Sequence, residues 1–118
     1  MISVGGLPDL EANRLAPANC GGPALMDALT AAPRRNPSIA YRDTSPVRML
    51  PIRARQILVA GALDRISPPR VSEDYARKAG QSAKTVIVPG EGHVELIAPG
   101  SQAWAREIAL IEQALGRR

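Results

Sequence analysis

The chain has 118 residues, of which 45% are hydrophobic and 22% are charged, the composition of an ordinary globular domain with a modest core. Its net charge of +4 comes from basic residues spread along the sequence, and only 3% of the residues are aromatic, so a nucleic-acid-binding face is not expected. No apolar run is long enough to span a bilayer and no signal peptide is evident, so we expect a cytoplasmic protein that does not bind membranes.

The first half of the chain, residues 1–56, is predicted to consist mostly of loops. Prolines recur at irregular intervals between residues 11 and 56, and proline interrupts helices and the interior of sheets. One helix is expected around Ala24–Ala32. The other regular elements are therefore expected mainly after residue 56.

The second half begins with a predicted strand–helix–strand unit. Ile57–Ala60 and Val86–Val88 are aliphatic at every position, the pattern of strands that helices cover on both faces. Between them, Pro68 and Pro69 open a segment of helical periodicity that Gly80 closes. The apolar residues that recur at helical spacing in this segment are Val71, Tyr75 and Ala79.

A last helix is predicted from Ser101, a suitable N-cap, to Gly116, a suitable stop. Its apolar residues recur at i, i+4, i+7 and i+11, namely Trp104, Ile108, Ile111 and Leu115. Such a stripe is expected to cover one face of a sheet. The order strand, helix, strand, helix from residue 57 onward favours an α/β fold with a parallel sheet and right-handed crossovers.

Each predicted strand is followed by a polar side chain that is capable of acid–base chemistry. Asp64 follows the first strand, and His93 follows the second, 29 residues later. The carboxyl ends of parallel strands meet at one edge of a sheet, where loops hold side chains over a rigid frame. The other interpretation is that the aspartate only forms a turn or caps a helix and the histidine is an ordinary loop residue.

These motifs resemble the carboxyl-terminal part of the α/β-hydrolase superfamily, in its branch of prolyl-oligopeptidase-like enzymes and small esterases. The resemblance rests on Gly61-x-x-Asp64-x-Ile66-x-Pro68, on Pro89-Gly-x-Gly-His93, and on a following helix with Ala103-Trp104. It extends backward, because residues 1–10 resemble the strand that follows the nucleophile's helix in these enzymes. Residues 44–51 resemble the stretch that leads to the acid-bearing strand.

The resemblance implies a single partial α/β-hydrolase domain over residues 1–118, with about three parallel strands and flanking helices. Residues 1–56 would supply a strand and a loop-rich helical segment near the mouth of the active site. Residues 57–118 would supply the unit that carries the acid and the histidine. In the superfamily the loop-rich segment helps to shape the substrate pocket, so Met26, Leu29 and Tyr41 are candidates for substrate contact, with ordinary packing as the favoured interpretation.

The chain departs from the superfamily in the nucleophile. Catalysis there requires a serine on a Gly-x-Ser-x-Gly turn and backbone N–H donors for the oxyanion, and no serine of this chain lies in such a turn. Because the serine precedes the acid and the histidine in the superfamily, the missing part is expected upstream of Met1. The resemblance thus implies a serine hydrolase of carboxylic esters or peptide bonds, of which this chain supplies only the acid and the base and is expected to be inactive alone.

In the implied triad, Asp64 holds one ring nitrogen of His93 and stabilises its imidazolium. The other nitrogen takes a proton from the serine and returns it to the leaving group. Glu91 and Glu95 flank the histidine in the sequence. Glu95 is the alternative orienting acid.

Cysteine and histidine usage limits other chemistry. Cys20 is the only cysteine, which excludes an internal disulfide and fits a reducing compartment. It is either a thiol nucleophile or, as we favour, a small residue in a glycine turn, because no activating partner is visible nearby. With one histidine and no CxxC or HExxH motif, no metal site is expected, and no cofactor is implied.

A second hypothesis is a non-catalytic α/β remnant that acts as a binding or assembly module. A three-stranded parallel sheet leaves an exposed edge, and an exposed edge pairs readily with another chain. This hypothesis predicts self-association without turnover. A third hypothesis, a small basic nucleic-acid-binding protein, would require steeply salt-dependent binding and is disfavoured.

Overall fold

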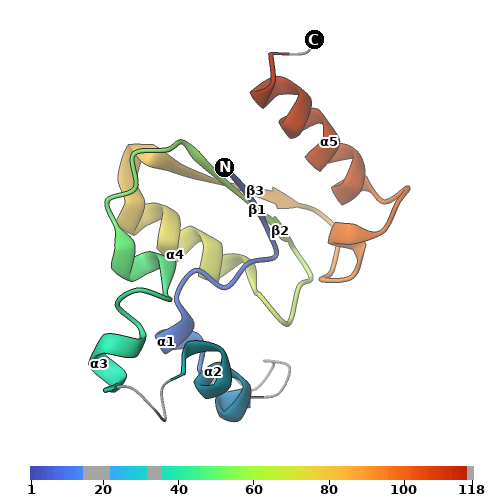
Figure 1. Cartoon of the computed structure of the whole chain (residues 1–118). Helices are drawn as coiled ribbons and strands as arrows, with labels where there is room; N and C mark the ends of the chain where they lie inside the picture. Colours follow the sequence, from blue (N-terminus) through green and yellow to red (C-terminus); the bar gives the residue numbers. More distant parts are fainter. Residues whose placement is uncertain (15–21, 32–35, 117–118) are drawn as a thin grey trace.

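The computed structural model of the chain describes residues 1–14, 22–31 and 36–116. Its centre is a sheet of three parallel strands in the order β1-β2-β3, formed by β1 (Ile2–Val4), β2 (Gln56–Gly61) and β3 (Ala83–Val88). Helix α4 lies along one side of the sheet and helix α5 stands on the other side (Figure 1). The expected α/β class, with about three parallel strands and flanking helices, is confirmed.

The middle strand, β2, is the most buried element of the sheet. Val59 pairs with Val4 of β1 and with Val86 of β3, and its side chain is fully buried. Aliphatic residues on both faces suit this position, because α4 and α5 lie on opposite sides of the strand. The strand extends the predicted run 57–60 by one residue at each end, and β3 begins three residues before the predicted Val86.

Helix α4 (Pro69–Ala79) connects β2 to β3 and covers one face of the sheet. It begins at Pro69, because the fixed φ of proline suits the first helical turn, where no N–H donor is needed. It ends before Gly80, whose φ of +62° is costly for other residues. Buried Tyr75 donates a hydrogen bond from its hydroxyl to Gln56 Oε1 at 2.7 Å, which ties the helix to the start of β2.

Helix α5 (Gln102–Ala114) follows the 3-10 helix η4 (Glu95–Ile97). The predicted N-cap is confirmed, since Ser101 Oγ accepts a hydrogen bond from the backbone N–H of Trp104 at 3.0 Å. The helix contributes to the main core of the protein. This cluster of buried residues consists of Val59, Val88, Leu96, Ala103 and Leu110.

The prediction that the apolar stripe of α5 covers the sheet is wrong. Its members, Trp104, Ile108, Ile111 and Leu115, are 37%, 41%, 43% and 67% exposed. The buried positions are instead Ala103, Glu107 and Leu110, about a quarter turn away around the helix. Periodicity shows where the apolar stripe of a helix lies, but not which surface the helix packs against. Here the small Ala103 side chain lets the first turn of α5 pack into the core, and this contact sets the rotation of the helix about its axis.

Short helices of the first half of the chain, α1 (Leu10–Asn13), α2 (Gly22–Thr30) and α3 (Pro37–Ala40), lie below the sheet in the view of Figure 1. The 3-10 helix η2 (Pro46–Met49) contacts α4. The helix expected at Ala24–Ala32 begins two residues earlier and ends at Thr30, and Ala32 lies outside the described residues. The strand expected within residues 1–10 is confined to Ile2–Val4.

Ion pairs join these short helices to one another. Arg14 forms two hydrogen bonds of 2.7 Å with Asp27, and the hydrogen bond from Arg14 lowers the pKa of the Asp27 carboxyl. Arg48 of η2 pairs with Glu11 of α1 at 2.5 Å. All these side chains are partly exposed, so the pairs contribute orientation more than stability.

Glu107 is a charged residue on the buried face of α5. Only 6% of its surface is exposed, and its Oε1 atom has no hydrogen-bond partner among the described residues. Burial raises the pKa of this carboxyl above its ordinary value. The folded protein therefore holds the proton more tightly than the unfolded chain does, and stability falls as the pH rises from the ordinary glutamate pKa through the raised value.

We expect Glu107→Gln to stabilise the protein at pH 7–8 by about 1 kcal/mol, because glutamine carries no charge to bury. Thermal unfolding followed by circular dichroism checks this, with Glu112→Gln as the matched exposed control on the same helix. The gain should shrink below the ordinary pKa of glutamate, where the native side chain is neutral too. A lower melting temperature for Glu107→Gln at pH 7–8 would show that the carboxylate has a stabilising partner.

Candidate active site

The carboxyl ends of the three strands carry the candidate site. β1 runs into Gly5-Gly6, β2 runs into the loop that contains Asp64, and β3 runs into the loop that contains His93. Because the strands are parallel, all three loops leave the same edge of the sheet. The structure brings Asp64 and His93 into contact at this edge.

The Asp64 carboxylate is completely enclosed, with a side chain that is 0% exposed. Oδ1 accepts hydrogen bonds from the backbone N–H groups of Ile66 and Ser67, both at 2.8 Å, and Oδ2 faces the His93 ring. A carboxylate is costly to bury unless its oxygens accept hydrogen bonds. Asp64 therefore both shapes its own turn and presents one oxygen to the imidazole.

The His93 ring is held on one side and open on the other. Its Nδ1 atom lies 2.8 Å from Asp64 Oδ2. An ionised carboxylate only accepts hydrogen bonds, so with Asp64 in that form Nδ1 is the donor and the lone pair of a neutral ring is on Nε2. The His93 side chain is 40% exposed, and no group in the described part of the chain hydrogen-bonds Nε2. One oriented nitrogen and one free nitrogen are what a general base needs.

Backbone contacts hold the Asp64 and His93 loops together. Ala62 N–H donates to the Val88 carbonyl at 2.9 Å, and Leu63 N–H donates to the Glu91 carbonyl at 2.8 Å. The loops approach most closely at Gly61, where an added Cβ would lie 2.4 Å from the Glu91 carbonyl oxygen. Only glycine permits this approach, which allows the carboxylate to reach the imidazole.

The two glutamates near His93 have other partners. Buried Glu91 accepts a hydrogen bond from the backbone N–H of Gln102 at 3.1 Å, so its carboxylate lies at the amino terminus of α5, where negative charge is favourable. Exposed Glu95 accepts from the backbone N–H of Gly92 at 3.1 Å. In this geometry Asp64, and not Glu95, faces the histidine ring.

Two residues of the site were not singled out by the sequence. Gly5 packs against the His93 ring, since an added Cβ would lie 3.2 Å from His93 Cε1. Ser67 is fully buried and donates from Oγ to the Gly6 carbonyl at 2.7 Å, which joins the Asp64 loop to the end of β1. A glycine pair directly after a short apolar run is the signal that could have identified the first of these contacts.

The remaining candidate residues lie apart from this pair in the sequence and differ in exposure. Met26 and Tyr41 are buried, which fits packing, whereas Leu29 is 65% exposed. Cys20 lies outside the described residues. Within residues 1–14, 22–31 and 36–116, no group of three or more histidine, cysteine or acidic side chains could hold a metal ion. None of the helices described is both long and apolar enough to cross a membrane.

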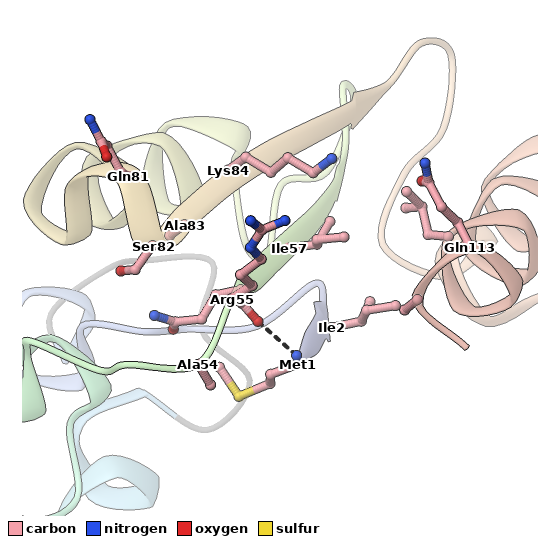
Figure 2. Close-up of a pocket in the computed structure, with 13 residues that line it drawn as sticks. Met1, Ile2, Ala54, Arg55, Ile57, Gln81, Ser82, Ala83, Lys84 and Gln113 are labelled. Atoms are coloured by element: carbon pink, nitrogen blue, oxygen red, sulfur yellow. Dashed lines mark hydrogen bonds between the residues drawn. The ribbon is translucent and has the colours of Figure 1, made fainter. Parts of the chain in front are cut away.

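A cavity of about 670 Å³ lies at the opposite end of the strands from the Asp64–His93 pair. Figure 2 shows the starts of the strands, including Ile57 and Lys84, on one side of this cavity and Gln113 of α5 on the other. The later turns of α5 contribute Leu110, Gln113 and Ala114 to the lining of the cavity. Neither Asp64 nor His93 lines it, so it is not the pocket of the candidate site.

Comparison with known proteins finds a likeness in structure and none in sequence. No protein-family model and no curated protein sequence matches the chain. A solved structure of a puromycin hydrolase matches with a TM-score of 0.64 and 19% sequence identity, over 99% of this chain and 18% of that one. The chain thus spans less than a fifth of the length of that protein, and at this identity the likeness concerns the fold alone.

Proposed function

We propose that this chain is the acid- and base-carrying part of a serine hydrolase that cleaves carboxylic esters or peptide bonds. The observation that carries the proposal is the 2.8 Å contact between His93 Nδ1 and the enclosed Asp64 carboxylate, on a ring whose Nε2 has no hydrogen-bond partner among the described residues. The nucleophilic serine and the oxyanion-binding N–H groups would come from a polypeptide segment outside these 118 residues. The fold shared with part of a puromycin hydrolase supports the proposal.

In the proposed mechanism, His93 Nε2 takes the proton from the serine hydroxyl as the oxygen attacks the substrate carbonyl. Asp64 stays ionised, holds Nδ1–H, and stabilises the imidazolium that forms. The imidazolium then gives its proton to the leaving alcohol or amine. In the second half-reaction, His93 deprotonates the water that hydrolyses the acyl-enzyme and returns the proton to the serine.

The single cysteine supports a cytoplasmic location as part of this proposal.

The proposal is tested by completing the protein. The DNA upstream of the Met1 codon is translated in all forward frames, and the chain is expressed with any in-frame segment that carries a Gly-x-Ser-x-Gly turn. A fluorophosphonate probe should then label that serine, and the protein should hydrolyse nitrophenyl esters or peptide anilides. The chain alone should do neither. Absence of labelling and turnover in the completed, folded protein would refute the proposed hydrolase.

The edge of the sheet favours a second candidate function, self-assembly. Ile57 N–H donates to the Met1 carbonyl and Gly5 N–H to the Val59 carbonyl, so in a parallel ladder the backbone groups of Ile2 and Val4 point away from β2. No described strand pairs with this side of β1. Such an edge accepts a strand from another chain.

If this edge mediates self-association, Val4→Pro is expected to prevent it, because proline removes an N–H from the free side while the ladder to β2 is kept. Val4→Ala is the matched control, since it shortens the same side chain without removing that donor. Sedimentation velocity over a concentration series should show association of the native chain and of Val4→Ala, and a monomer for Val4→Pro. A native chain that stays monomeric throughout the series would rule out the assembly function.

A further inference from the structure

The His93 ring lies directly against the backbone of Gly5, at the end of the first strand. A Cβ added to Gly5 would lie 3.2 Å from His93 Cε1 and 3.3 Å from His93 Nδ1. The same Cβ would lie 3.0 Å from Leu96 Cδ1. A side chain at position 5 would therefore crowd both the edge of the ring that carries Nδ1 and the buried Leu96 side chain.

Hydrogen bonds fix the position of the backbone around Gly5. Gly5 N–H donates to the Val59 carbonyl at 2.9 Å, which binds it to the central strand. Ser67 Oγ donates to the next carbonyl, that of Gly6, at 2.7 Å, while Ser67 N–H donates to Asp64 Oδ1 at 2.8 Å. One buried serine thus bonds both the Asp64 carboxylate and the backbone next to Gly5. These bonds tie the end of β1 to the Asp64 loop.

We propose that Gly5 is a positioning residue for His93: because it has no side chain, the ring can lie against the backbone in the position in which Nδ1 meets Asp64. The catalytic role of this positioning rests on the proposed function, but the position of the ring can be tested without measuring hydrolysis. Contacts of 3.0–3.3 Å to a new methyl group are too close, so one neighbour must move. Leu96 is 1% exposed in the core, whereas the His93 side chain is 40% exposed. The ring is therefore the group that yields, and its bond to Asp64 lengthens.

Gly5 also has a positive φ of +55°, which strains any other residue, so backbone strain must be separated from contact with the ring. Gly22 offers the matched control. Its φ is +56°, and an added Cβ there would meet no atom of the described residues within 4 Å. Gly22→Ala introduces the same kind of strain without touching the site.

His93 is the only histidine of the chain, so its imidazole gives single, unambiguous NMR signals. In the native protein the Nδ1 proton that is shared with Asp64 should appear far downfield and exchange slowly with water. We expect Gly5→Ala to lose this downfield signal and Gly22→Ala to keep it. Amide spectra should show that both variants are folded, and thermal unfolding should show that strain destabilises both, with a larger loss in Gly5→Ala because its Cβ also meets Leu96 and His93. A folded Gly5→Ala protein that keeps the native signal would overturn the proposal.

A second pair of variants keeps the test decisive if Gly5→Ala does not fold. Ser67→Ala removes the hydroxyl that holds the Gly6 carbonyl, and Ser82→Ala removes a comparable bond of 2.9 Å to Ala79, on the link between α4 and β3. The downfield signal should weaken in Ser67→Ala and persist in Ser82→Ala, and equal signals would contradict the proposal. Because these readouts do not depend on hydrolysis, an inactive completed protein would refute the proposed function while the positioning by Gly5 still stands or falls on the NMR result.

Discussion

Replacing Asp64 by asparagine is expected to lower kcat of the nucleophile-completed protein by about 10,000-fold. The two side chains have nearly the same volume, so the fold should survive. Asparagine can present an N–H to the ring in place of an oxygen, and this favours the tautomer that carries its proton on Nε2. Nε2 then has no lone pair with which to accept the serine proton. Steady-state hydrolysis of a nitrophenyl ester measures the loss.

The comparison variant for this prediction is Glu95→Gln. Glu95 is in the histidine loop, but its carboxylate accepts a hydrogen bond from the backbone N–H of Gly92, whereas Asp64 lies 2.8 Å from His93 Nδ1. We therefore expect Glu95→Gln to retain kcat within about 10-fold, because only loop geometry is affected. The reverse pattern, with a severe loss in Glu95→Gln and near-native turnover in Asp64→Asn, would identify Glu95 as the orienting acid.

Replacing Gly61 by alanine is expected to destabilise the fold by about 3 kcal/mol. The new Cβ would lie 2.4 Å from the Glu91 carbonyl oxygen and 2.8 Å from that of Gly92. Both neighbours are backbone atoms, and the Glu91 carbonyl also accepts the hydrogen bond from Leu63 N–H. The two loops would have to separate. Thermal unfolding should show a drop in Tm on the order of 10 °C or more.

Gly92→Ala is the matched control for Gly61→Ala. Neither glycine has a positive φ, and a Cβ at Gly92 would also make a contact of 2.8 Å. The atom that it meets is Glu95 Oε2, at the far end of an exposed, flexible side chain that can rotate away. We expect a cost below about 1 kcal/mol. Equal destabilisation by the two substitutions would mean that the backbone approach at Gly61 is not a special constraint.

The juxtaposition of Asp64 and His93 could be anticipated because it depends on topology. Two aliphatic runs with a helix between them predict neighbouring parallel strands, and residues that follow such strands emerge at the same edge. What could not be anticipated is how the contact is supported. Gly5 and Gly61 act through the absence of a side chain, and the space that such an absence leaves is defined only when distant segments meet.

Helix α5 shows the limit of sequence periodicity. Its position and its N-cap at Ser101 follow from local preferences, because capping is a contact between residues close in the sequence. The face of the helix that is buried does not follow from local preferences. The most apolar stripe, which includes Ile108 and Ile111, remains exposed, whereas Glu107 is buried, because packing of Ala103 and Leu110 in the core sets the rotation of the helix.

The sequence by itself determined the α/β class, the order of strands and helices from residue 57 onward, and the candidate pair Asp64 and His93. These features depend on hydrophobic periodicity, on glycine and proline signals, and on the rule that parallel strands end at one edge, all of which act over short segments. The tertiary structure decided between Asp64 and the alternative Glu95 as the carboxylate that faces the imidazole, and it alone decided which glycines permit the close approach and which side of α5 is buried. Those outcomes depend on steric fit between segments far apart in the chain, and no local pattern encodes such a fit.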